Sequence, residues 1–144
     1  MTLDEEIGRR EGWIREMDDR DRVSLKEDID SIVQNVDRFV RGDKTEDLQN
    51  AVYRLLGQIE PIYLGVPSGD PTDEARRIGE KIQSLRVAAK RIFLKKDPAS
   101  LQEAAGDSEA LKLIADDIKM TYDDFTSRRE RYRTELSDLR RSTR

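Results

Sequence analysis

The most regular hydrophobic pattern in the chain runs from Asp107 to Arg144. Seam positions recur there alternately four and three residues apart, and all but one are apolar: Leu111, Ala115, Ile118, Tyr122, Phe125, Arg129, Tyr132, Leu136 and Leu139. A heptad repeat of this kind is typical of a long helix with an apolar seam. At about 1.5 Å per residue the helix would be roughly 45 Å long, longer than a small domain is wide. We therefore expect it to span the molecule and to project beyond it.

Apolar residues at helical spacing also predict two helices near the N-terminus. The first would cover Leu3 to about Asp19, with Thr2 as its N-cap and acidic residues in the first turn. The second would begin after a Ser24 cap and end at Gly42, a residue type that commonly stops helices. Its broad apolar stripe indicates a helix packed against a core.

Two more helices are predicted in the middle of the chain. The third would end or kink at Pro61, because proline lacks the backbone N–H that a helix needs. The fourth would begin at Asp70 and Pro71, a capping residue followed by a favourable first helical residue, and would run to about Lys96. A short helical turn would follow, and we expect Gly106 to stop it before the long last helix begins.

The segment from Ile62 to Asp70 is the only long irregular stretch, and it is unusually apolar for a loop. Its Ile62, Leu64 and Val66 would plug one end of a helical bundle in the simpler interpretation. The alternative is that they form an exposed hook for a protein partner, because apolar loop residues on a surface often mark an interaction site.

Composition fits a slender helical protein. The 144 residues are the usual size of one domain, and 35% are apolar whereas 40% are charged. We predict an all-α fold, a helical bundle of about five helices whose long C-terminal helix extends as a coiled coil. Residues 1–144 would form a single domain, with residues 127–144 as a projecting helical extension.

The absence of two residue types narrows the chemistry. The chain has no histidine, the commonest general base and metal ligand, and no cysteine, so it has neither disulfides nor thiolates. The net charge is −4, and no apolar run approaches the roughly 20 residues that a membrane span needs. We expect a soluble, cytoplasmic protein that is not an enzyme and binds no cofactor.

Charge is distributed in blocks along the chain. Residues 76–96 have a net charge of +7, residues 97–124 of −6, and residues 125–144 of +4. Exposed ion pairs contribute only tenths of a kcal/mol each, but like charges side by side are penalised. The blocks therefore predict that the basic fourth helix lies beside the acidic first part of the last helix, in a hairpin.

The arginine-rich C-terminus supports an alternative function in nucleic-acid binding. The candidate residues are the basic fourth helix together with Arg128, Arg131, Arg133, Arg140 and Arg141. Phosphate binding needs a contiguous positive face, whereas the bases of the fourth helix fall on both flanks of its apolar stripe. Nearby aspartates could also neutralise these arginines in the fold, so nucleic acid is the less favoured partner.

Carboxylates supply a further, weaker alternative. Glu27 and Asp30 share one face of the second helix, and Asp116 and Asp123 lie seven residues apart on the last helix. If the two helices were neighbours, these oxygens could hold Mg²⁺, as in phosphohydrolases of the all-helical type. The last helix could not bind the ion alone, because its two aspartates, seven residues apart, are separated by two turns.

The preferred function follows from the seam. A helix longer than its own domain has to bury Tyr132, Leu136 and Leu139 somewhere, and a second chain is the simplest cover. Arg129 either fixes the register of that contact or lies in water beyond the end of the core. We therefore predict a non-enzymatic interaction or assembly module that forms a homodimer or docks a partner helix. The predicted interface comprises Tyr122, Phe125, Arg129, Tyr132, Leu136 and Leu139, with Ile62, Leu64 and Val66 as a second contact.

Overall fold

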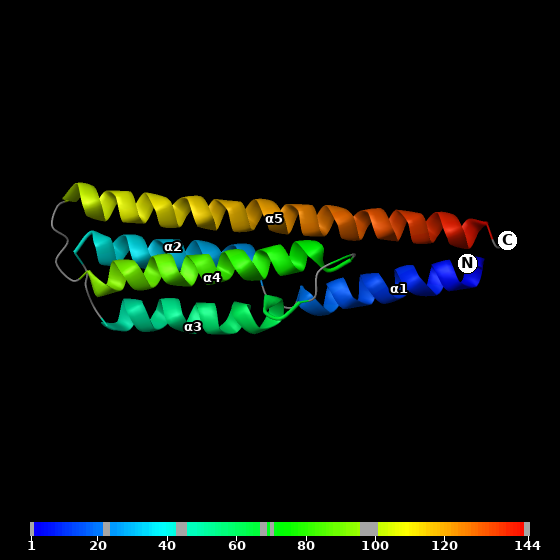
Figure 1. The fold of residues 1–144 in the computed structure, drawn as a ribbon, viewed down its shortest axis with the longest axis horizontal. Coiled ribbons are helices and arrows are strands. Elements are labelled where there is room, and N and C mark those ends of the chain that lie inside the picture. The colour runs from blue at the N-terminus through cyan, green and yellow to red at the C-terminus, as the bar shows by residue number, and fades with distance from the viewer. Residues whose placement is uncertain are drawn as a thin grey trace.

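The computed structural model of the chain describes residues 2–21, 24–42, 46–66, 69, 71–95 and 101–142. Within these residues the chain forms helices and no strands, so the all-α prediction is confirmed. The elements are α1 (Leu3–Arg20), α2 (Leu25–Val40), α3 (Glu46–Tyr63), α4 (Asp73–Leu94) and α5 (Leu101–Arg141) (Figure 1).

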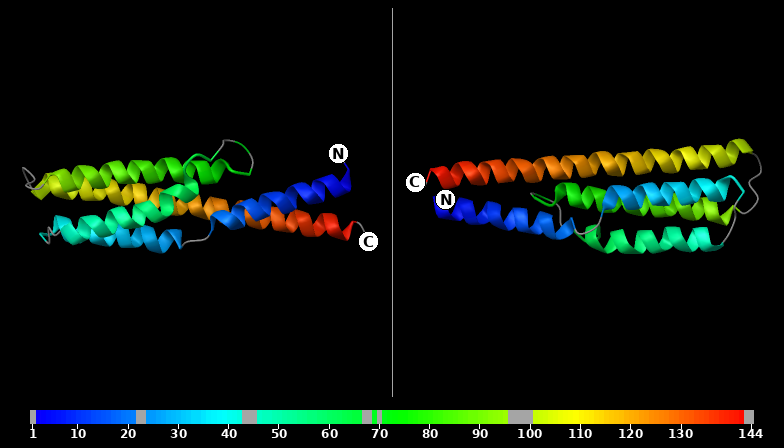
Figure 2. Two further views of the ribbon diagram at one scale, coloured as in Figure 1. Left: turned by 90° about the horizontal axis from the view of Figure 1, so that it is seen from below. Right: turned by 180° about the vertical axis from the view of Figure 1, so that it is seen from behind.

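The last helix is the axis of the molecule. With 41 residues, α5 runs the full length of the structure; α2 and α4 pack along its first part and α1 along its last part (Figures 1 and 2). We call α2, α3, α4 and residues 101–125 of α5 the body. We call α1 and residues 126–141 of α5 the arm. The body has four helices in cross-section and the arm has two, which run antiparallel and bring both chain ends to the far end of the arm.

The core of the body draws on each of its four helices. Ile29, Leu56, Ile82 and Ile118 come from α2, α3, α4 and α5 in turn, and all are fully buried. Within the body each of these helices packs mainly against two neighbours, in the order α2, α3, α4, α5 around the bundle. The apolar stripes read from the sequence therefore face one common core.

The predicted pairing of α4 with α5 is confirmed. Lys81 Nζ on α4 lies 2.9 Å from Asp117 Oδ2 on α5, and Lys95 Nζ lies 3.0 Å from Asp107 Oδ2. The opposite charges that the sequence places on these two helices thus meet across their boundary. Such pairs contribute little stability, but they favour this neighbour and this antiparallel orientation.

Helix ends agree with the sequence at Thr2 and at Gly42, which follows the end of α2 with a positive φ of 122°, and differ at several other positions. Thr2 Oγ1 accepts a hydrogen bond from the backbone N–H of Glu5 (3.2 Å), as an N-cap does. Ser24 precedes α2, but its side chain makes no capping hydrogen bond. The helix expected to start at Pro71 begins at Asp73 instead, after Thr72; its proposed cap, residue 70, lies outside the described residues.

Gly106 does not stop a helix, contrary to the prediction. The helix α5 begins at Leu101 and continues through Gly106. A glycine inside a helix costs only about 1 kcal/mol relative to alanine. Lys95 Nζ contacts Glu103 (2.6 Å) on one side of this glycine and Asp107 (3.0 Å) on the other, which supports the helical turn around it.

Pro61 does not end α3, which continues to Tyr63. Ile62 is therefore helical and half-buried, Val66 is 7% exposed, and Leu64 is 38% exposed. The apolar segment thus mostly packs onto the bundle, with Leu64 at its surface. Its residues 67, 68 and 70 lie outside the described part. Next to it, Gly79 lets α4 approach closely, because a Cβ there would lie 2.1 Å from the carbonyl oxygen of Tyr63.

Candidate functional site

The predicted interface along α5 is largely covered within the chain itself. Phe125 is fully buried, and Tyr132 and Leu136 are only 5% and 7% exposed. The cover is α1, whose Trp13 lies with its ring centroid 4.8 Å from that of Tyr132. A second chain is therefore not needed to bury Tyr132 and Leu136. The apolar seam predicted on α5 is largely buried, but the helix that covers its second half is α1 of the same molecule.

Arg129 holds the C-terminal end of α1 against α5. Its side chain is 12% exposed, and its guanidinium donates to Asp18 Oδ1 (3.2 Å) and to Asp21 Oδ2 (2.9 Å) at the end of α1. Tyr122 donates its hydroxyl proton to the other oxygen of Asp21 (2.6 Å). The charged residue in the seam thus neither lies in open water nor faces a second copy, because it fixes where α1 leaves α5.

Two tyrosines at this junction are held in the protonated state. Burial, followed by the hydrogen bond and charge of Asp21, raises the pKa of Tyr122 to about 12. Burial and the same carboxylate raise the pKa of Tyr63, whose hydroxyl donates to the backbone carbonyl of Arg20 (3.4 Å). Both phenols therefore act as hydrogen-bond donors at neutral pH, which suits a structural junction between α1, α3 and α5.

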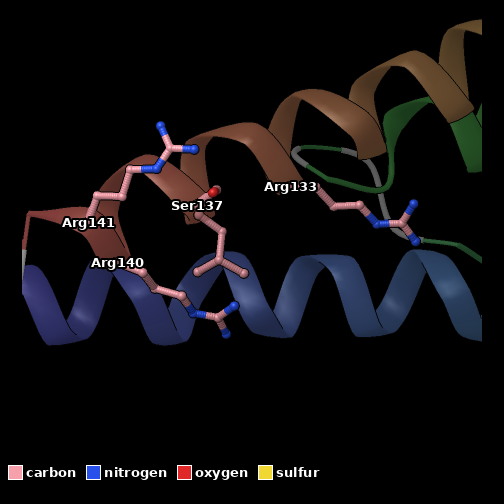
Figure 3. Close-up of a pocket in the computed structure, with 5 residues that line it drawn as sticks. Arg133, Ser137, Arg140 and Arg141 are labelled. Carbon is pink, nitrogen blue, oxygen red and sulfur yellow. The ribbon is translucent and has the colours of Figure 1, made fainter.

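The arm has two surface hollows on either side of Leu136. One, of about 350 Å³, is lined by Arg133, Leu136, Ser137, Arg140 and Arg141 (Figure 3). In Figure 3 the side chains of Arg133 and Arg140 extend towards α1, whereas Arg141 points away from it. The other hollow, of about 340 Å³, lies between the two helices and is lined by Glu11, Ile14, Arg15, Asp18, Asp19, Leu136 and Arg140. Leu136 and Arg140 border both hollows.

The arm also leaves several apolar side chains half-covered. Trp13 on α1 packs beside Tyr132 yet stays half-exposed. Leu139, near the end of α5, is also half-exposed. The full set of half-exposed apolar residues in the arm is Leu3, Ile7, Trp13, Ile14 and Leu139. A helix pair cannot enclose side chains on all sides, whereas a four-helix bundle can. The arm is therefore the less complete part of the molecule.

The arginines proposed for nucleic-acid binding do not form one open positive face. Most lie beside carboxylates: Arg128 Nε is 2.9 Å from Glu74, Arg133 Nη2 is 3.0 Å from Asp18 and Arg140 Nη2 is 3.5 Å from Glu11. The remaining two are exposed: Arg141, 3.7 Å from Asp138 of its own helix, and Arg131. The acids of α1 and α4 thus share the positive charge of α5, whereas the aspartates of α5 that the sequence suggested for this role pair with lysines, as Asp117 does with Lys81 and Asp123 with Lys26.

The carboxylates proposed for Mg²⁺ face lysines instead of one another. Asp30 forms an ion pair with Lys119, and Asp123 Oδ1 lies 2.6 Å from Lys26 Nζ. Glu27 and Asp116 are exposed. Over the described ranges, no three carboxylates come close enough together to hold a metal ion. Helices α2 and α5 are neighbours, as the shared metal site would require. Across their boundary, however, Asp30 and Asp123 each face a lysine of the opposite helix.

The sequence contained an unused signal for the pairing of α1 with the end of α5. Residues 3–20 carry seven acids and four bases, whereas residues 128–141 carry six arginines and three acids. The same complementarity that correctly paired α4 with α5 thus also pairs α1 with the other half of α5. Arg10 Nε, 2.9 Å from Glu135 Oε2, is one of the contacts that result.

Across the part of the chain that the structure describes, no helix combines the length and apolarity needed to cross a membrane. Neither a protein-family model, nor a curated protein, nor a solved structure shows a significant match to this chain, so the site is interpreted from its own geometry.

Proposed function

We propose that the protein is a non-enzymatic interaction module whose arm docks a helix from another chain. The observation that supports this function is the half-covered apolar surface of the arm. Trp13, Ile14 and Leu139 pack against only one neighbouring helix, whereas residues such as Ile82 and Ile118 in the body are fully enclosed. A third helix laid along the arm would bury this surface and would cover the α5 seam further.

The energetic argument concerns apolar area. Each 100 Å² of apolar surface removed from water contributes about 2.5 kcal/mol before the costs of association are subtracted. Half-exposed tryptophan, isoleucine and leucine side chains can supply such area without any change in the fold. The hollows beside Leu136 provide places for the side chains of a docked helix.

Charge favours an acidic partner on the α5 side of the arm. Arg133, Arg140 and Arg141 line the hollow of Figure 3, and residues 128–141 have a net charge of +3. Arg141 points away from α1 and is 77% exposed, so it is available to a carboxylate from outside. We therefore propose an amphipathic helix with an apolar stripe and acidic flanks as the occupant.

The test uses two labelled amphipathic peptides that share a leucine stripe and differ in carrying glutamate or lysine on the polar face. Fluorescence anisotropy of each peptide is measured as the full chain is added. We expect the glutamate peptide to bind more tightly and Arg141→Glu to weaken that binding at least severalfold. The matched control is Arg54→Glu on α3, an exposed arginine in the body, which should leave binding unchanged. Equal binding of both peptides, or none, would overturn the proposal.

A labelled DNA duplex at low salt serves as a third probe in the same assay. Binding that falls steeply with salt and is lost in Arg141→Glu would replace the helix partner by nucleic acid. Release of phosphate from nucleotides that depends on Mg²⁺ would instead favour the enzyme alternative.

A further inference from the structure

A second surface, away from the arm, also exposes apolar side chains. On α4, Val87 is 58% exposed and Leu94 72%; on α5, Leu113 is 64% exposed and Met120 66%. Each pair is seven residues apart, so its two members lie on the same face of their helix, two turns from each other. Among the described residues the next most exposed large apolar side chain is Leu64, at only 38%. The outer faces of two neighbouring helices thus hold most of the exposed apolar surface.

The contacts between the two helices align these residues. Lys81 Nζ lies 2.9 Å from both Asp117 Oδ2 and Thr121 Oγ1, so Lys81 is level with the middle of that turn of α5. The helices run antiparallel. The midpoint of that turn is residue 119 of α5, which is therefore level with Lys81 of α4. Because the helices are antiparallel, a step of six residues forward along α4 matches a step of six residues back along α5. Val87 is thus level with Leu113.

The charges around these apolar residues are of opposite sign on the two helices. Arg77, Lys90 and Arg91 on α4 and Glu109, Asp116 and Asp124 on α5 form no ion pair with any described residue. They lie on the outer or flanking sides of their helices, whereas the boundary between the helices is occupied by pairs such as Lys81 with Asp117. The outer face of α4 is thus basic with an apolar centre, and the outer face of α5 is acidic with an apolar centre.

We propose that two copies of this chain associate through these outer faces, with α4 of each copy lying on α5 of the other. A second copy is the occupant because it carries both complementary faces. Two symmetric arrangements are available. A two-fold axis perpendicular to the helices would lay basic α4 on basic α4, which like-charge repulsion disfavours. A two-fold axis parallel to the helices lays basic α4 on acidic α5 twice.

The parallel axis also matches the heights of the side chains. Rotation about an axis parallel to the helices leaves the height of every residue along that axis unchanged. Val87 of each copy therefore meets Leu113 of the other, and Arg91 meets Glu109, which is level with it by the same alignment. The two arms extend from the same end of this dimer, and both arms remain open for the docking proposed above.

The test is the molar mass of the full chain in solution, measured by light scattering over a range of concentrations. We expect the mass to approach twice 16.7 kDa and to return to 16.7 kDa in Val87→Asp and in Leu113→Asp. Both side chains are exposed, so the melting temperature of the monomers should stay close to that of the unaltered chain. Leu64→Asp is the matched control, because Leu64 is exposed on neither face. A monomer at every concentration would overturn the proposal.

Charge reversal tests the arrangement. Arg91→Glu and Glu109→Arg should each weaken the dimer at least severalfold, and the two changes together should restore it. If the dimer persists in Val87→Asp and Leu113→Asp but is lost in Leu139→Glu, the contact lies on the arm. That result would overturn the proposal that the outer faces of α4 and α5 form the dimer. The peptide assay on Arg141→Glu reports on the arm alone, so the two proposals can fail separately.

Discussion

The two halves of α5 share one repeat but have different surroundings. In the body, Ile118 and Phe125 are fully buried among neighbouring helices, whereas in the arm Leu139 stays half-exposed beside α1 alone. The first half packs against α2 and α4 together, whereas the second half packs along α1 and reaches α4 through the ion pair of Arg128 with Glu74. A heptad seam therefore shows that a helix will be covered along one side, but not by how many helices or from which chain.

The largest expected difference in the free energy of unfolding is between alanine substitutions at two glycines of the body. Gly79→Ala would place a Cβ 2.1 Å from the backbone oxygen of Tyr63, and a backbone carbonyl cannot rotate aside as a side chain can. We expect a loss of about 4 kcal/mol in the free energy of unfolding, measured with urea. Gly57→Ala in α3 is the control: a Cβ there meets nothing within 4 Å, so the change should stabilise by up to about 1 kcal/mol. A small loss in Gly79→Ala would contradict the close α3–α4 approach.

The next effect compares matched truncations on the two halves of α5. Ile118→Ala leaves a cavity enclosed by the body, so we expect it to cost about 3 kcal/mol in the free energy of unfolding. Leu136→Ala should cost about 2 kcal/mol or less, because a site beside surface hollows can relax or admit water. Urea denaturation of both variants measures the two losses of unfolding free energy and shows which is larger. A larger loss at Leu136 would show that the arm is packed as completely as the body.

A third change loosens the two helices of the arm from each other. Arg129→Ala removes the guanidinium that contacts Asp21 and shares Asp18 with Arg133, at a cost of about 2 kcal/mol. Trp13 is the only tryptophan of the chain and lies in the arm, so its fluorescence reports on this half alone. We expect acrylamide to quench Trp13 more strongly in the variant. Arg131→Ala, at an exposed position of α5, is the control and should leave the quenching unchanged.

The smallest effect is a dependence on alkaline pH. The pKa of Tyr122 is raised from 10.0 to about 12 in the folded chain. Its contribution to stability is therefore present below pH 10 and is lost as the pH rises through about 12. The melting temperature should fall less between these pH values in Tyr122→Phe than in the unaltered chain. Equal slopes for the two proteins would contradict the hydrogen bond from Tyr122 to Asp21.

The sequence predicted features that depend on local pattern and missed those that depend on tertiary contacts. Periodicity located the helices, and the charge blocks paired α4 with α5. Local pattern predicts a helix end at Gly106 and an end or kink at Pro61, because each residue weakens a helix. Ion pairs from Lys95 support the helix around the first, and α3 continues through the second to Tyr63. Local pattern could not weigh these compensations.

The candidate site shows the same division. The seam from Tyr122 to Leu139 was found from its spacing, and most of it is buried as a seam should be. Its cover was assigned to a second chain, because spacing alone does not show that α1 folds back along it. Arg129 illustrates the limit: its place in the repeat marked it as unusual, but its role depends on two aspartates more than a hundred residues away in the chain.

The most direct test of the incomplete arm is hydrogen exchange along α5, measured on the full chain with and without the glutamate-faced peptide. We predict that amides of residues 128–141 exchange faster than those of residues 108–125 in the free chain, and that the peptide slows exchange in 128–141 only. The lysine-faced peptide should have little effect. Uniform protection along the whole of α5, unchanged by either peptide, would contradict the proposal that the arm is an open docking surface.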